Sequence, residues 1–345
     1  MERSLLDTTW YNQGMPTPTL AILIVNYNTR ELLSGCLDSV FSSTCRYPFR
    51  VLLVDNDSTD GSVEFVIEHY PQVELLESGY NGGFGFANNI ALRALEVHGQ
   101  IHVQQPVQSQ SRGSQPGSEI PAQGNAGLQF GADYILFLNP DTALPPNALE
   151  IMVDFMERTP DAGVAGPRLE RPDGSLDLAC RRSFPTPLNS LFKLSGLSRL
   201  FPGSASISRY NLTHLSEHET AEVDSVVGAF MLVRGAALGQ AGLYDERFFM
   251  YGEDLDLAYR IKERGWRVFY YPAVTVLHIK GASSRKRSAR SIREFYRAMH
   301  IFYSKHYAAR YGRLVSTMVR LGITLRAALA LAVNATRAAE QKRVS

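Results

Sequence analysis

Carboxylate side chains that follow apolar runs are the residues of this chain best suited to chemistry. Asp141 ends the segment Asp133-Tyr-Ile-Leu-Phe-Leu-Asn-Pro-Asp, in which an apolar run gives way to Asn-Pro-Asp. The run predicts a buried strand, and the proline predicts a turn after it, because proline cannot donate to a β-ladder. Ligands bind at the carboxyl ends of strands in open α/β sheets, so Asp141 is a candidate contact to a metal ion or a phosphate. A turn-capping aspartate is the alternative.

A second group of carboxylates, Asp55, Asp57 and Asp60, follows the apolar run at residues 49–54. The same sheet edge is expected to carry them, although Asp also favours turns and caps, so one or two should be structural. A glycine turn at residues 82–85 opens a predicted helix, where backbone N–H groups could approach a diphosphate. No glycine fingerprint follows the first strand, which argues against a dinucleotide site.

An acidic cluster, Glu253-Asp254-Leu-Asp256, lies at the start of another predicted helix. Residues two apart on a helix diverge by about 200°, so Asp254 and Asp256 cannot both face one site. Asp256 has Arg260 four residues later, a spacing that suits an ion pair on the surface or behind the site. Asp254 is therefore the candidate general base. The alternative is that it only complements the helix dipole.

His278 ends a predicted apolar strand. A lone histidine there is more often a core residue with satisfied hydrogen bonds. Beside Asp141, however, an imidazole and a carboxylate suit Mn²⁺ or Mg²⁺ carrying a diphosphate. Asp141 and His278 are therefore candidate metal ligands.

Alternating strands and helices are predicted around these side chains. Strands are expected at residues 19–27, 49–54, 73–76, 134–138, 164–169 and 267–277, and helices at residues 30–43, 62–69, 81–97, 146–158 and 253–265. This order implies right-handed parallel crossovers in an α/β fold. A further apolar stretch covers residues 223–233. Residues 99–131 are of low complexity and predict a surface insertion, whereas residues 171–220 predict an irregular loop on the acceptor side.

Composition is that of a globular enzyme: 345 residues, 45% hydrophobic, 20% charged and a formal net charge of +1. A net charge so close to zero excludes a polyanion-binding protein that relies on charge alone, and no nucleic-acid partner is expected. Three cysteines are too few for a disulfide framework, which favours a reducing compartment. The first 18 residues show no secretory segment, so a cytoplasmic location is expected.

Charge is uneven along the chain. Residues 285–345 hold 14 Lys and Arg against two acids, so the rest of the chain carries a net charge of −11. Residues 313–333 have an apolar helical pattern interrupted by Arg320 and Arg326, which favours an interfacial helix on an anionic membrane over a membrane span. A helix packed on the catalytic domain or on a second subunit is the alternative. The expected organisation is an N-terminal extension (1–18), a catalytic domain (19–284) and a basic helical tail (285–345).

The motifs resemble those of glycosyltransferase family 2, in its rhamnosyltransferase-like branch. They follow the family's order: Ile24-Val-Asn-Tyr-Asn28, Val54-Asp-Asn-Asp-Ser-Thr-Asp-Gly-Ser62, Asn81-Gly-Gly-Phe-Gly-Phe-Ala-Asn-Asn89, Leu138-Asn-Pro-Asp141, residues 228–234, residues 244–257 and His278. The resemblance covers residues 20 to about 284. Asn139 departs from the Asp-x-Asp pattern of many family members at its first aspartate.

The resemblance implies a GT-A fold, with a mainly parallel mixed sheet flanked by helices and a C-terminal helical extension. It also implies transfer of a sugar, with inversion, from a nucleoside diphosphate donor to a hydroxyl. By motif, Asp254 would be the general base, Asp55 would hold the nucleoside, and Asp141 and His278 would hold Mg²⁺ or Mn²⁺ with the diphosphate. The same motifs add further expected substrate contacts: Asn28, Asp57, Asn81, Gly83, Asn89 and Glu253.

The expected function is therefore transfer of a sugar, rhamnose by resemblance to the branch, to a glycan or polyprenyl-linked acceptor in cell-surface polysaccharide synthesis. A sugar nucleotidyltransferase is one alternative, but no glycine-rich loop with Lys or Arg follows the first strand to hold a triphosphate. A carbohydrate-binding relative without turnover is the other.

Overall fold

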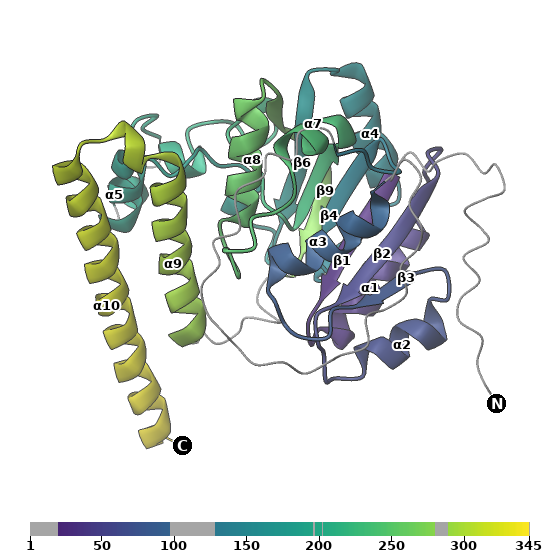
Figure 1. Ribbon diagram of the computed structural model, residues 1–345, viewed down its shortest axis with the longest axis horizontal. Helices are drawn as coiled ribbons and strands as arrows, with labels where there is room; N and C mark the ends of the chain where they lie inside the picture. Colours follow the sequence, from purple (N-terminus) through teal and green to yellow (C-terminus); the bar gives the residue numbers. More distant parts are fainter. Residues whose placement is uncertain (1–19, 97–127, 196, 202, 280–288, 345) are drawn as a thin grey trace, which may run out of the picture.

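β1 (Leu20–Asn26) and β4 (Tyr134–Leu138) form the centre of a mixed sheet, and every residue of both strands is buried. The computed structural model describes residues 20–96, 128–195, 197–201, 203–279 and 289–344 (Figure 1). Within them the sheet has the order β3-β2-β1-β4-β8-β6-β9-β5, and β7 also pairs with β9. The other strands are β2 (Phe49–Asp55), β3 (Glu74–Glu77), β5 (Thr142–Ala143), β6 (Ala162–Glu170), β7 (Ala221–Val223), β8 (Phe230–Arg234) and β9 (Arg267–His278).

Strand direction brings the candidate side chains to one edge of the sheet. β1 is parallel to β2 and β4, and β2 is parallel to β3. β8 is antiparallel to both β4 and β6, and β9 is parallel to β6, so β9 points the same way as β4. The C-terminal ends of β2, β4 and β9 and the N-terminal end of β8 therefore share an edge. Asp55, Asp141 and His278 all lie at that edge, which is called the active-site edge below.

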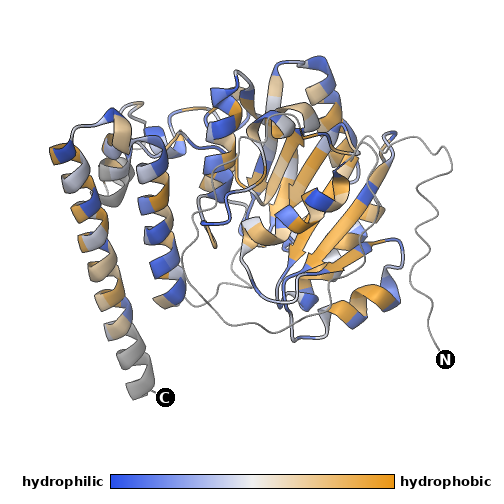
Figure 2. Ribbon diagram, viewed as in Figure 1, coloured by the Kyte–Doolittle hydropathy of each residue, from blue (hydrophilic) through white to orange (hydrophobic). Residues whose placement is uncertain are grey.

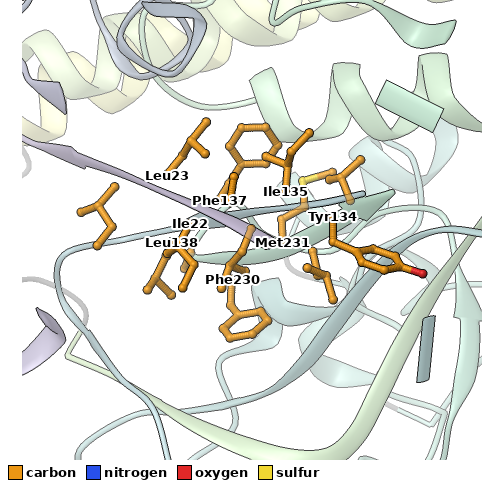
Figure 3. Packing of buried hydrophobic residues seen from close by; sticks show 14 of the residues in the cluster. Ile22, Leu23, Tyr134, Ile135, Phe137, Leu138, Phe230 and Met231 are labelled. Carbon is orange, nitrogen blue, oxygen red and sulfur yellow. The ribbon is translucent and has the colours of Figure 1, made fainter. Parts of the chain in front are cut away.

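Helices cover the sheet, with α3 packed on β1 and β2, and with α4 and α8 packed on β6 and β9 (Figure 1). The helices are α1 (Arg30–Phe41), α2 (Ser62–His69), α3 (Phe84–Leu95), α4 (Ala148–Arg158), α5 (Pro187–Ser195), α6 (Leu197–Leu200), α7 (Gly235–Ala241), α8 (Glu253–Glu263), α9 (Ala289–His306) and α10 (Arg313–Val344). Between them lies a core that includes Ile22, Phe137 and Phe230 (Figure 3). Each such side chain contributes about 1.5–3 kcal/mol on burial.

α9 and α10 form an arm to one side of the sheet, and α10 runs back along α9 (Figure 1). The arm is attached to α8 by a second apolar cluster, in which Leu255 and Tyr259 of α8 pack with Phe302 and Tyr303 of α9. Hydrophobic residues also occur along α10, whereas the sheet strands are hydrophobic almost throughout (Figure 2). The segment Arg313–Thr336 is long and apolar enough to cross a membrane, and only 11% of its most apolar stretch is buried.

The predicted α/β architecture and its C-terminal helical region are confirmed. The expectation of an irregular segment at residues 171–220 is wrong in part, because α5, α6 and short 3₁₀ turns lie within it. The apolar stretch at residues 223–233 begins with the last residue of β7, continues through residues 224–229 between the strands, and ends within β8. The N-terminal extension (1–18), most of the expected insertion (99–127) and the basic run at 285–287 lie outside the described residues.

Candidate active site

Asp141 and His278 meet where the short strand β5 pairs with the end of β9. Thr142 is opposite His278 in this register, and the N–H of Ile279 donates to the carbonyl of Asp141 (2.8 Å). Both side chains are buried, and Oδ1 of Asp141 lies 3.4 Å from Nε2 of His278. Oδ1 accepts no hydrogen bond from the described part of the chain. The pairing of the two strands thus places the two side chains in contact.

Asp177 holds the other side of the His278 ring, at 3.0 Å between Oδ2 and Nδ1. Burial lowers the pKa of His278, but the carboxylates Asp141 and Asp177 outweigh burial, so the pKa is raised overall. Sequence reasoning missed Asp177 because it falls in the segment 171–220. A possible signal was its position in Asp173-Gly-Ser-Leu-Asp177, a turn followed by a 3₁₀ helix that Asp177 caps.

A divalent cation fits Asp141 and His278 chemically. A buried carboxylate oxygen without a hydrogen-bond partner and a ring nitrogen face each other, and both are ligands of Mn²⁺ or Mg²⁺ in proteins. No group of three or more His, Cys, Asp or Glu side chains within the described ranges could hold a metal ion by itself. Two protein ligands would thus leave the remaining positions to a diphosphate and water.

Asp254 lies in the first turn of α8 and is held on several sides. Its Oδ2 accepts a hydrogen bond from Nη2 of Arg182 (2.7 Å) and from the N–H of Gly228 (3.1 Å). Its Oδ1 accepts from the N–H of Leu255 (2.7 Å). Gly228 precedes β8 at the active-site edge, and the carbonyl of Ala229 accepts from the N–H of Asn139 (3.0 Å). The adjacent residues Gly228 and Ala229 therefore connect Asp254 to the Asn-Pro-Asp turn.

Arg182 is the second residue that sequence reasoning missed. It is buried and also donates to the carbonyl of Val226 (2.8 Å). Burial lowers the pKa of Arg182, but the negative charge of Asp254 has the opposite effect, and the pKa is raised overall. The guanidinium therefore remains protonated. The two side chains form a buried ion pair. No periodicity or motif in the sequence links Arg182 to Asp254.

Glu253 and Tyr244 add two polar groups without partners close to Asp254. Oε2 of Glu253 and the hydroxyl of Tyr244 are buried and bond to no described residue. Burial raises the pKa of Glu253, and the negative charge of Asp254 raises it further. The site thus contains a carboxylate fixed by an arginine beside a carboxyl group that favours its protonated form.

Asp256 is separate from the site, as its position on the helix predicted. It pairs with Arg260 (2.9 Å), and its Oδ1 lies 2.7 Å from both Nζ of Lys305 and Nε2 of His306. Asp256 and His306 are buried, whereas Arg260 is partly buried and Lys305 is exposed. Lys305 and His306 come from α9, so Asp256 holds the arm against α8.

The side chains that the sequence predicts to hold the nucleotide lie at the ends of β1 and β2 and in the loops after them. Asp55 accepts hydrogen bonds from Nδ2 of Asn26 (2.8 Å) and from the N–H of Ser58 (2.8 Å). Asn28 and Asp57 are exposed, and both adopt the left-handed backbone (φ 52° and 69°) that Asn and Asp tolerate better than most residues. The structure thus presents Asp55, Asn28 and Asp57 together at the active-site edge.

Three N–H groups of the glycine turn before α3 donate within the protein. Gly82 and Gly83 donate to side chains of Asn56 and Asn81, and Phe84 donates to the carbonyl of Phe249 (3.0 Å). Gly83 has φ 95°, and a Cβ there would lie 2.3 Å from the carbonyl oxygen of Phe249. The glycine therefore permits close backbone packing.

Asn89 bridges α3 to the loop before α8. It donates to the carbonyl of Tyr244 (2.9 Å) and accepts from the N–H of the same residue (2.9 Å). Nδ2 also donates to Glu246 (2.8 Å). The side chain of Asn89 thus fixes the loop from which α8 begins.

The fold is the GT-A fold of glycosyltransferases. The structure is similar to the crystal structure of GalNAc-T7 with UDP, GalNAc and Mn²⁺, at 15% sequence identity and a TM-score of 0.52. The match covers 89% of this chain and 54% of that chain. A model described as "Glycosyltransferase like family 2" matches residues 16–297. The chain therefore belongs to glycosyltransferase family 2, and the family, fold and enzyme class expected from the sequence are confirmed.

Two related proteins are named rhamnosyltransferases. The chain is 29% identical over 326 residues to the N-acetylglucosaminyl-diphospho-decaprenol L-rhamnosyltransferase of Mycobacterium tuberculosis, covering 94% of this chain and 97% of the relative. It is 25% identical over 272 residues to the rhamnosyltransferase WbbL of Escherichia coli K12, covering 79% of this chain and 88% of the relative. Both similarities extend over most of each protein.

Proposed function

We propose that this enzyme transfers rhamnose, with inversion, from a nucleoside diphosphate donor to a hydroxyl of a polyprenyl-diphosphate-linked sugar in cell-surface polysaccharide synthesis. The observation that carries the proposal is the active-site edge, where an arginine-held Asp254 and the Asp141–His278 pair are joined through Gly228 and Ala229. The near full-length similarity to a rhamnosyltransferase named for a decaprenol-linked acceptor supports the choice of sugar and acceptor.

Asp254 is assigned as the general base. An aspartate within hydrogen-bond reach of the acceptor hydroxyl takes its proton as the oxygen attacks the anomeric carbon from the face opposite the diphosphate. The hydrogen bonds from Arg182, Gly228 and Leu255 fix the orientation of Asp254. A preoriented base reduces the entropy lost on reaching the transition state.

Asp141 and His278 are assigned to Mn²⁺ or Mg²⁺, consistent with the Mn²⁺ in the GalNAc-T7 structure. The cation would stabilise negative charge on the departing diphosphate. Asp55, with Asn28 and Asp57, is assigned to the nucleoside, and Glu253 to a sugar hydroxyl because its Oε2 is buried without a hydrogen-bond partner among the described residues. Asn81, Gly83 and Asn89 are assigned to holding the backbone that frames the donor.

The decisive experiment combines donor binding with product analysis. A thermal-shift panel of UDP-, dTDP- and GDP-sugars, with and without Mn²⁺ or Mg²⁺, should give the largest rise in midpoint with dTDP-rhamnose plus metal. A ligand at 100 times its Kd stabilises the native state by about 2.7 kcal/mol. Incubation with a polyprenyl-diphospho-GlcNAc acceptor should then yield a rhamnosylated lipid and a nucleoside diphosphate. Pyrophosphate as product would indicate a nucleotidyltransferase, and binding without turnover a non-catalytic relative.

We also propose that α10 lies on an anionic cytoplasmic membrane surface, which brings the enzyme to a lipid-linked acceptor. Leu314, Met318, Leu321, Leu325 and Leu329 form one exposed stripe, with Leu314 77% and Leu325 61% exposed. Ser316 and Ile323, on the opposite side of the helix, are buried. At 100° per residue, Arg320 and Arg326 lie roughly 100° or more from the centre of the stripe. They could therefore reach headgroups while the stripe enters the interface.

Vesicle co-sedimentation tests this contact. The wild-type protein should bind phosphatidylglycerol vesicles more than phosphatidylcholine vesicles, and Leu321→Glu with Leu325→Glu should abolish binding. Thr317→Glu, on an exposed polar part of α10, is the control and should bind nearly as well as wild type. If the double variant changes a dimer to a monomer and leaves vesicle binding intact, the stripe joins two copies of the chain instead.

A further inference from the structure

Asp177 is buried against His278 on the side of the ring away from Asp141. The separations are 3.0 Å from Nδ1 to Asp177 Oδ2 and 3.4 Å from Nε2 to Asp141 Oδ1. Asp177 is itself held in place, because its Oδ1 accepts from the N–H of Ala179 (3.2 Å) and lies 3.5 Å from Nη2 of Arg171. The imidazole therefore lies between two carboxylates with different surroundings.

The two ring nitrogens have different roles in this arrangement. A neutral imidazole has one N–H and one lone pair, and a carboxylate accepts hydrogen bonds. Asp177 thus holds a proton on Nδ1, so that Nε2 could offer its lone pair to a cation that lies beside Asp141. Oδ1 of Asp141 has no hydrogen-bond donor among the described residues. Two facing lone pairs are stabilised when a cation lies beside both.

We propose that Asp177 is a positioning residue that fixes the ring orientation and tautomer of His278 for a divalent cation carrying the donor diphosphate. The inference rests on the proposed metal site and adds a residue to it. A carboxylate behind a ligating histidine commonly contributes 10–100-fold to metal affinity. Asp177 would act through His278, without contacting the substrate.

Mn²⁺ affinity, measured by electron paramagnetic resonance with and without dTDP, tests this role. Asp177→Leu should weaken Mn²⁺ binding by about 10–100-fold. Asp177→Asn keeps an acceptor for the Nδ1 proton but loses the charge, so it should weaken binding by a smaller factor. Asp173→Asn is the matched control and should bind as wild type does, since Asp173 is an exposed aspartate of the same loop whose side chain accepts hydrogen bonds from Ser175 within its turn.

The outcomes separate this inference from the proposed metal site. Thermal unfolding without metal identifies any variant that fails to fold, and if Asp177→Leu fails, the folded Asp177→Asn decides. Wild-type affinity in Asp177→Asn and Asp177→Leu, while His278→Ala loses Mn²⁺, would overturn the role of Asp177 alone. Failure of the wild-type protein to bind Mn²⁺ with dTDP would overturn the metal site and this inference together.

Discussion

The nucleotide side and the base side of the active-site edge are held in different ways. Asp55 is fixed by neutral donors, and one of them is the backbone of Ser58, three residues along. Asp254 and His278 are fixed by Arg182 and Asp177, buried charged residues 72 and 101 positions away in the sequence. The nucleotide side is thus built within motifs, whereas the base side depends on a distant segment of the chain.

This difference has an energetic consequence. Removing one member of a buried ion pair leaves an uncompensated charge and costs about 3–5 kcal/mol. Removing a hydrogen bond between neutral groups costs about 0.5–1.5 kcal/mol. Substitutions on the base side should therefore reduce stability and activity together, whereas those on the nucleotide side should mainly reduce donor binding.

Arg182→Met should give the largest effect. It leaves Asp254 buried without its cation, so we expect a loss of about 3–5 kcal/mol in the free energy of unfolding, measured with urea, together with loss of transfer. Arg46→Met is the matched control, since Arg46 pairs with Glu150 on the surface and should contribute less than about 1 kcal/mol. Equal losses of unfolding free energy in the two variants would contradict the larger contribution expected from the buried ion pair.

Asp256→Asn should have a smaller, pH-dependent effect. Burial raises the pKa of Asp256, but His306, Arg260 and Lys305 lower it overall, so the carboxylate stabilises the fold above its unfolded pKa of about 3.9. That contribution is lost as pH falls through the folded pKa. The difference in unfolding free energy between wild type and variant should therefore be large at pH 7 and shrink below pH ~4. A difference that is constant from pH 7 to pH 3 would contradict this account.

Asp55→Asn should have the smallest effect on stability, about 1 kcal/mol, because its partners are neutral. Donor affinity, measured by calorimetry, should fall by a larger factor than in Arg182→Met under conditions where both variants are folded. Unchanged donor affinity in Asp55→Asn would remove this residue from the nucleotide side.

The same comparison explains how much of the site could be predicted. Asp141 and His278 follow apolar runs, so strand order alone places both at one edge, and the structure brings them into contact. The separation of Asp254 from Asp256 also follows from helical geometry, since Asp254 pairs with Arg182 whereas Asp256 pairs with His306. The burial of Asp256 could not be predicted, because α9 covers it with side chains 50 residues later.

The contacts of Asp177 and Arg182 with His278 and Asp254 could not be predicted, because their segment has no regular apolar period. Their positions depend on how the chain after β6 folds back, with Arg182 bridged to Ser225. The glycine turn at residues 82–85 differs from that segment, because it has a clear sequence pattern. Its pattern suggested a diphosphate cradle, but the carbonyl of Phe249, distant in sequence, accepts from one of its N–H groups.

Transfer by Asp254→Asn tests the central claim most directly. Single-turnover transfer to a polyprenyl-diphospho-GlcNAc acceptor, with donor saturating, should be about 10²–10⁴-fold slower than in wild type, while donor binding measured by calorimetry is retained. Glu263→Gln, another carboxylate of α8, should transfer at nearly the wild-type rate. Transfer by Asp254→Asn within a few-fold of wild type would contradict the assignment of Asp254 as the base.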